Sequence, residues 1–95
     1  MGFRKRLFNR VESDSGFIVK IRVFSGYVEY REGHRVAKIP VEPVMGETVV
    51  NVYANTSIKW EHPYVSDLIS EEKRKEILTN VVDALRFRKV PVDFV

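Results

Sequence analysis

Apolar and polar side chains alternate with a period of two residues through the first half of the chain. In residues 17–24, Phe17, Val19 and Ile21 fall on one face and Lys20 and Arg22 on the other. This alternation is typical of a strand with one buried face. The sequence therefore predicts a strand at 17–24.

Further strands are predicted at 27–32 and 34–41, bounded by turn signals at Ser25-Gly26 and Glu32-Gly33. Val28, Tyr30, Ala37 and Ile39 are expected to face inward, and Pro40 limits the third strand because proline donates no ladder hydrogen bond. A loop at 42–47 leads to two short strands at 48–53 and 57–60. Strands this close together, with no helix between them, indicate an antiparallel meander.

The period then changes to that of a helix. Ser70 is a candidate N-cap, and Glu71 and Glu72 lie in the first turn, where the helix dipole favours anions. Five apolar side chains share an arc of about 140° on a helical wheel: Ile77, Leu78, Val81, Val82 and Leu85. Residues 89–95 read as a final strand, and Pro91 favours an edge position.

These elements predict an α+β fold. It comprises an antiparallel β-meander of five to six short strands, one amphipathic C-terminal helix packed on one face, and a final edge strand. Ninety-five residues with 44% hydrophobic and 31% charged content suit one globular domain. We expect that domain to span residues 17–95, behind a basic, flexible N-terminal tail of residues 1–16.

The positive charge is concentrated in that tail. Residues 1–10 carry Arg4, Lys5, Arg6 and Arg10 and no acid, so the remaining 12 Lys and Arg face 13 Asp and Glu, a net of −1 against +3 for the chain. The tail interleaves these cations with apolar side chains, and such an arm could bind nucleic acid or an anionic membrane surface. A tail without a role is the other interpretation.

Other features favour a cytoplasmic protein. The chain has no cysteine, which excludes disulfides and thiolate sites. It has no apolar run near the roughly 20 residues that span a bilayer, and its start lacks the apolar core of a signal peptide.

Catalytic motifs are missing as well. His34 and His62 stand apart from any metal-ligand pattern, and the glycines are isolated turn residues rather than a phosphate loop. Glu71 and Glu72 are adjacent on the predicted helix and point about 100° apart, so they cannot share a proton. We expect no enzyme activity, metal or cofactor.

A binding role is more consistent with the outer face of the helix. Glu72, Glu76 and Asp83 lie opposite the apolar arc, with Asn80 between them to position a hydrogen bond. Such a face could dock a basic protein, since complementary charge accelerates association. The alternative is an ordinary solvated face.

The stretch from Trp60 to Tyr64 connects the meander to the helix. We expect Trp60 to be a core anchor and Pro63 to end the strand, because proline biases His62 towards an extended conformation. Trp60 and Pro63, with Ile77, Val81 and Leu85 of the helix, are the predicted structural residues. His62 and Tyr64 are predicted to act, if at all, in a contact surface.

Arg74 is an exception within the apolar arc. Its stem is expected to pack at the sheet edge with the guanidinium in water. An inward ion pair with Glu42 or Glu29 is the alternative.

One pattern runs from the end of the meander through the helix and comprises Ser57, Ile58, Trp60, Pro63, Ile69, Ile77, Leu78, Asn80, Ala84 and Leu85. With this pattern, residues 27–94 resemble a family of small bacterial immunity proteins of polymorphic-toxin and contact-dependent inhibition systems. It implies an α+β fold and a non-catalytic protein that binds and neutralises a cognate toxin. It carries over no functional residues.

Two other binding modes stay open in the sequence. A nucleic-acid-binding module using the basic N-terminal arm is the alternative to an immunity protein. An edge strand at 89–95 or 17–24 could pair with the partner or form a homodimer.

Overall fold

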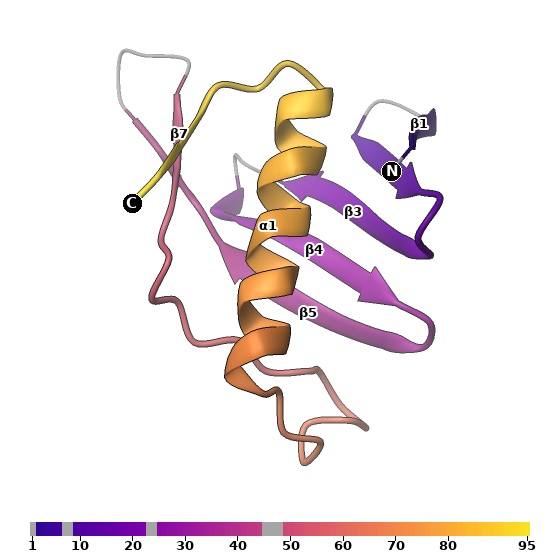
Figure 1. The fold of residues 1–95 in the computed structure, drawn as a ribbon. Helices are drawn as coiled ribbons and strands as arrows, with labels where there is room; N and C mark the ends of the chain where they lie inside the picture. Colours follow the sequence, from indigo (N-terminus) through magenta and orange to yellow (C-terminus); the bar gives the residue numbers. More distant parts are fainter. Residues whose placement is uncertain (1, 7–8, 23–24, 45–48) are drawn as a thin grey trace.

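The computed structural model describes residues 2–6, 9–22, 25–44 and 49–95, without the side chains of residues 4–6. Within these residues the chain forms two sheets and one helix (Figure 1). The first sheet is antiparallel and has five strands in sequence order: β1 (Phe3–Arg6), β2 (Arg10–Ser13), β3 (Phe17–Arg22), β4 (Tyr27–Glu32) and β5 (Arg35–Pro40). The second has the order β6 (Glu42–Pro43), β7 (Val50–Val52) and β8 (Val92–Phe94), and the helix α1 spans Glu71–Phe87. The fold is α+β, as predicted.

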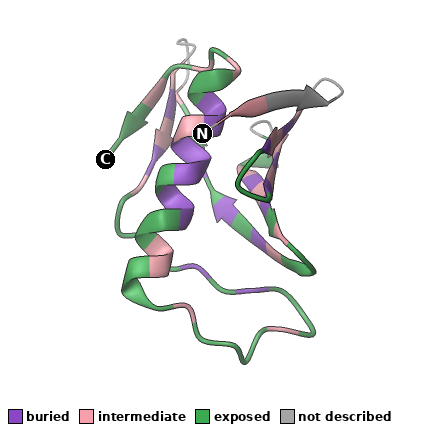
Figure 2. Ribbon diagram, turned by 45° about the vertical axis from the view of Figure 1, so that its right-hand side comes forward, coloured by how far each residue is buried: buried purple, intermediate pink, exposed green. Residues whose placement is uncertain are grey.

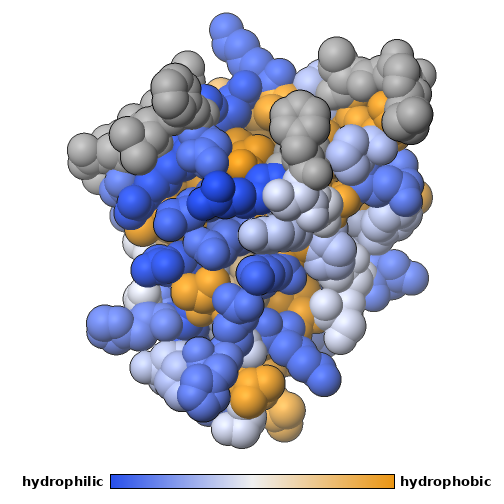
Figure 3. Space-filling model, turned by 180° about the vertical axis from the view of Figure 1, so that it is seen from behind, coloured by the Kyte–Doolittle hydropathy of each residue, from blue (hydrophilic) through white to orange (hydrophobic). Residues whose placement is uncertain are grey.

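The register of the five-stranded sheet places its inward side chains in rows. Val11 pairs with Val19, Val19 with Tyr30, and Tyr30 with Ala37, and all four side chains are buried. The opposite face of the sheet is mainly hydrophilic (Figure 3), and there Lys20 and Glu29 form an ion pair at 3.7 Å. The period-two pattern of the sequence therefore corresponds to one face packed on the core and one in water.

Helix α1 lies across the inner face of this sheet (Figure 1). Its N-cap is Ser70, whose Oγ accepts a hydrogen bond from the backbone N–H of Lys73 at 3.1 Å. The purple stripe along the helix in Figure 2 marks its buried residues: Ile77, Leu78, Asn80, Val81, Val82, Ala84 and Leu85. These positions span about 200° of the helical wheel, more than the predicted 140° arc.

The wider arc follows from the second sheet, which gives the helix another neighbour. Strand β8 contacts α1, as β3 and β4 do, and Val50 and Val52 of β7 belong to the same buried cluster as the helix. One hydrophobic core is therefore shared by both sheets, and α1 buries two sides instead of one.

The meander differs from the predicted one in its last members. Strand β7 lies within the predicted strand 48–53 but belongs to the second sheet, and Thr48 is outside the described residues. Residues 57–60 form no strand, although Ile58 and Trp60 are both buried. Immediately after them, the backbone N–H of Glu61 donates to the Val36 carbonyl of β5 at 2.7 Å. This single hydrogen bond does not add another strand to the sheet beside β5.

The N-terminal residues require a larger correction. Strands β1 and β2 replace the flexible tail expected there, because two of their side chains join the core: Val11 is fully buried, and the Phe3 ring packs against Phe17 and Phe87 at centroid distances of 6.1 and 5.4 Å. The row of rings continues through Tyr30 to Trp60. Independent folding of residues 17–95 stays a prediction.

Arg74 ties α1 to the segment that follows β7. Its Nη1 donates to the carbonyls of Ala54 at 2.5 Å and Thr56 at 3.1 Å, and its Nε donates to Glu71 at 2.9 Å. The carboxyl partner is therefore Glu71, on the same helix, and neither Glu42 nor Glu29. Arg74 lies on the side of α1 that faces the second sheet, which explains its place within the apolar arc.

The buried N-terminal strands give the first testable prediction. Val11→Ala should lower the free energy of unfolding by about 2–3 kcal/mol, because it removes buried methyl groups and leaves a cavity. Denaturant unfolding measures this effect. Val65→Ala is the matched control, since Val65 is 55% exposed and should change stability by less than about 0.5 kcal/mol. Equal stabilities of the two variants would show that β2 contributes nothing to the core.

Candidate functional site

Residues 61–70 form a loop, here called the crossing loop, that connects Trp60 to α1. Two backbone hydrogen bonds of 2.9 Å shape it into successive turns, from Tyr64 N–H to the Glu61 carbonyl and from Asp67 N–H to the Tyr64 carbonyl. The His62–Pro63 peptide bond is cis. In Figure 1 the loop runs below the N-terminal end of α1, beside the sheet.

Arg35, at the start of β5, anchors the crossing loop to the sheet. Its guanidinium donates two hydrogen bonds to Asp67 Oδ2, at 2.9 and 3.3 Å. The same group lies over the Tyr64 ring, 4.8 Å from the ring centroid. An Arg that pairs with a carboxylate and stacks on an aromatic ring restrains both partners. These contacts connect the crossing loop to the start of β5.

The anchored loop carries two large apolar side chains in water. Leu68 is 96% exposed and Val65 is 55% exposed, whereas the neighbouring Ile69 packs against the core. A single exposed apolar residue is ordinary on a protein surface. Two large exposed apolar side chains on one loop offer apolar surface that a partner could bury.

An acidic stripe, formed by Glu72, Glu76 and Asp83, continues from this loop along α1. The three positions fall within about 40° of one another on the helical wheel, and Glu72 and Glu76 are exposed while Asp83 is half-buried. A shallow hollow of about 260 Å³, lined by Ser70, Glu72, Lys73 and Glu76, opens where the stripe meets the loop. Within the described parts of the chain, Glu72 and Asp83 form no ion pair.

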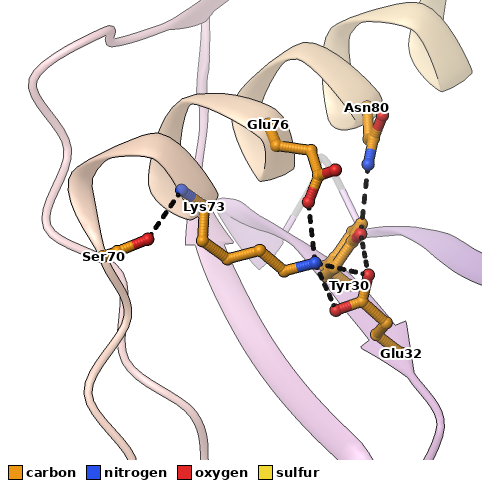
Figure 4. Close-up of polar contacts among 6 residues, drawn as sticks. All are labelled: Tyr30, Glu32, Ser70, Lys73, Glu76 and Asn80. Carbon is orange, nitrogen blue, oxygen red and sulfur yellow. Dashed lines mark hydrogen bonds and ion pairs between the residues drawn. The ribbon is translucent and has the colours of Figure 1, made fainter.

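The structure contradicts the exposed role expected for Asn80. Its side chain is buried and donates from Nδ2 to the Tyr30 hydroxyl at 3.2 Å (Figure 4). The Tyr30 hydroxyl donates in turn to Glu32 Oε1 at 3.2 Å. Asn80 therefore joins the helix to the sheet, because its side of α1 faces the sheet rather than water.

Lys73 connects this buried pair to the surface (Figure 4). Its Nζ lies 2.7 Å from a Glu32 oxygen and 2.7 Å from a Glu76 oxygen. Burial alone lowers the pKa of Lys73, but hydrogen bonds to Glu32 and Glu76 outweigh it and the net shift of the pKa is upward. Burial also raises the pKa of Tyr30 to about 12. One ammonium group between two carboxylates keeps a negative charge near Glu76.

Only some of the residues predicted to contact a partner therefore lie in one region of the structure. His62 and Tyr64 lie on the crossing loop, and Glu72 and Glu76 lie in the helical turns that follow it. Asp83 is about 16 Å farther along the helix axis than Glu72, at 1.5 Å per residue. The sequence pattern does not indicate the exposure of Leu68 and Val65, because an apolar residue beside Ile69 and before a helix is typical of a core position.

The basic residues do not form a free arm. Arg4, Lys5 and Arg6 lie in β1, paired with β2, and the side chain of Arg10 is 3.8 Å from that of Glu12. No group of three or more His, Cys, Asp or Glu residues suited to holding a metal ion occurs in the described ranges. The one described helix is too short and too polar to cross a membrane.

Comparison with known protein families gives a match over most of the chain. A family model for immunity protein 74 (Imm74) matches residues 20–95. It confirms the resemblance found in residues 27–94 and extends it into β3. No curated protein and no solved structure gives a significant match.

The buried hydroxyl of Tyr30 predicts a loss of stability at alkaline pH. An unfolded tyrosine ionises near pH 10, whereas the raised pKa keeps native Tyr30 protonated to about pH 12. The Tyr30 hydroxyl therefore makes its full contribution to the free energy of unfolding below pH 10, and this contribution is lost as the pH rises from about 10 to 12. Tyr30→Phe should remove this part of the slope in unfolding free energy against pH.

Tyr53→Phe is the control for this measurement. The pKa of Tyr53 is also raised, by its hydrogen bond to Glu42, so this variant removes the contribution of Tyr53 but should leave the part of the slope that belongs to Tyr30. An identical pH slope in Tyr30→Phe and the unmodified chain would contradict the assignment.

Proposed function

Because this chain belongs to the immunity protein 74 family, we propose that it binds a cognate bacterial toxin and neutralises it. Residues 20–95 match the family model and include the crossing loop and the whole of α1. Members of immunity families act by binding, so the proposed mechanism needs no catalytic group. Neutralisation then depends on the affinity and lifetime of the complex.

The observation that best supports a binding surface is the anchored, apolar crossing loop. Interfaces gain most of their affinity from a few side chains near their centre that become fully desolvated, surrounded by contacts that exclude water. Leu68 provides such an anchor at 96% exposure, and the charged pair of Arg35 and Asp67 lies beside it. We assign Leu68, Val65 and Tyr64 to the centre of the toxin contact.

The acidic stripe supports the proposal that the toxin presents a basic surface at this contact. Glu72 has no compensating ion pair within the described residues, and Lys73 offsets only one of its two carboxylate partners. Opposite charge across an interface accelerates association and orients the two proteins. The acidic stripe would therefore guide the toxin towards the apolar anchor.

A two-step experiment tests the apolar anchor. The tagged protein and the tag alone are used to isolate partners from the organism that encodes the chain, and the protein enriched only by the tagged chain is identified. That protein is then expressed with and without this chain. We expect it to be toxic alone, to be neutralised by the unmodified chain, and to bind the Leu68→Asp variant at least about tenfold more weakly.

Ser25→Asp is the control for added negative charge. Ser25 is exposed in the turn between β3 and β4, at the opposite end of β4 from Arg35. This variant should protect as well as the unmodified chain. Full protection by Leu68→Asp would exclude the crossing loop as the contact, and a partner that is not toxic would exclude the immunity function.

The acidic stripe makes a separate kinetic prediction. Glu72→Lys should slow association with the isolated toxin by about two- to tenfold at low ionic strength, and the difference should narrow as salt screens the charges. Asp14→Lys, at an exposed position after β2, gives the same change in net charge. Equal association rates for the two variants would show that only the total charge matters.

A further inference from the structure

Strand β8 has one unpaired edge. It lies at the end of the second sheet, parallel to β7, and its paired side is marked by hydrogen bonds from Val50 N–H to the Pro91 carbonyl at 3.0 Å and from Val95 N–H to the Val52 carbonyl at 2.8 Å. Because backbone groups alternate along a strand, Val92 and Phe94 direct their N–H and C=O away from β7. No other described backbone group bonds to them.

Apolar surface accompanies this edge. Phe94 is 47% exposed, and its ring borders a hollow of about 260 Å³ between β8 and α1. Leu78 and Ala54 also line the hollow, and Lys75 and Thr79 lie on the helix beside it. Free backbone groups next to apolar surface are the features by which a sheet edge accepts another extended chain. Figure 2 shows β8 at the margin of the molecule, next to the C-terminus.

Asp93 indicates whether the extended chain added at this edge is a second copy of this protein or a different protein. It is exposed and alternates with Val92 and Phe94, so it faces the other side of the sheet. Antiparallel pairing of two β8 strands over all three residues would place two Asp93 side chains directly opposite each other. Like charges in that position are destabilising, whereas a Lys or Arg there is favourable.

We propose that β8 binds an extended segment of another protein with a basic residue between two apolar residues. The basic side chain pairs with Asp93, and the apolar side chains pack over Phe94 and into the hollow beside Leu78. The backbone of the segment bonds to the free groups of Val92 and Phe94. This site is separate from the crossing loop, and it can be tested without the toxin.

The test uses two synthetic peptides and the full, isotope-labelled chain. The probes are acetylated and amidated Thr-Val-Lys-Val-Thr and Thr-Val-Glu-Val-Thr, titrated to millimolar concentration while backbone amide signals are recorded by NMR. The lysine peptide should shift the amides of Val92 and Phe94 and bind about two- to fivefold more tightly than the glutamate peptide. Asp93→Lys should reverse this preference.

A matched pair of variants tests the backbone contact. Phe94→Pro and Phe94→Ala both remove the ring, but only proline also removes the outward N–H, and that N–H is not used in pairing with β7. The lysine peptide should bind Phe94→Ala weakly and should not bind Phe94→Pro. The Asp93→Lys variant keeps every backbone N–H of β8. Its peptide preference therefore tests the proposal even if Phe94→Pro does not fold.

Three results would overturn the proposal. The first is the absence of amide shifts at Val92 and Phe94, and the second is equal affinity for the two peptides. The third is a dependence of these signals on protein concentration without peptide, which would identify a second copy as the occupant. None of these results bears on toxin binding by the crossing loop.

Discussion

Helix α1 has to bury two of its sides at once, and most features of this fold depend on that constraint. The five-stranded sheet covers one side and the second sheet covers another, so the buried residues occupy more than half of the helical wheel. Only a narrow face remains in water, and it carries the acidic stripe. A chain of 95 residues gains stability from this arrangement, because two small sheets share a single core instead of needing one each.

Because α1 packs against two sheets, some of its polar side chains also lie where the helix meets a sheet. Asn80 and Lys73 lie towards the five-stranded sheet, where Tyr30 and Glu32 provide their partners. Arg74 lies towards the second sheet and donates to carbonyls after β7. Buried polar groups are costly unless they are paired. Each of these side chains therefore fixes the helix against one sheet, and the pairing gives the packing its orientation.

Two surfaces left over by this packing are suited to binding. The crossing loop must span from the edge of β5 to the start of α1, and its anchor to Arg35 leaves Leu68 in water. Strand β8 returns from the other end of α1 and has β7 as its neighbour on one side only. One surface offers side chains and charge, the other offers backbone hydrogen bonds. They suit different kinds of contact, a folded protein surface and an extended segment.

The sequence by itself determined the features that depend on local periodicity. Alternation identified strands β3, β4 and β5 and their inward side chains, and the helical spacing with Ser70 identified α1 and its cap. The family resemblance also lay in the sequence, within residues 27–94. For the candidate site, the sequence predicted the region from His62 to Glu76, because the chain changes direction there and acidic residues follow.

Tertiary structure alone decided which elements became neighbours. Val50–Val52 pairs with β6 and β8 in a second sheet instead of extending the meander, and the alternation of the sequence does not distinguish these two pairings. Whether Phe3 and Val11 belonged to a tail or to the core depended on rings and strands distant in sequence. Asn80 is buried instead of exposed for the same reason. Periodicity specifies which face of an element is apolar, but the number of faces that become buried depends on how many partners pack against it.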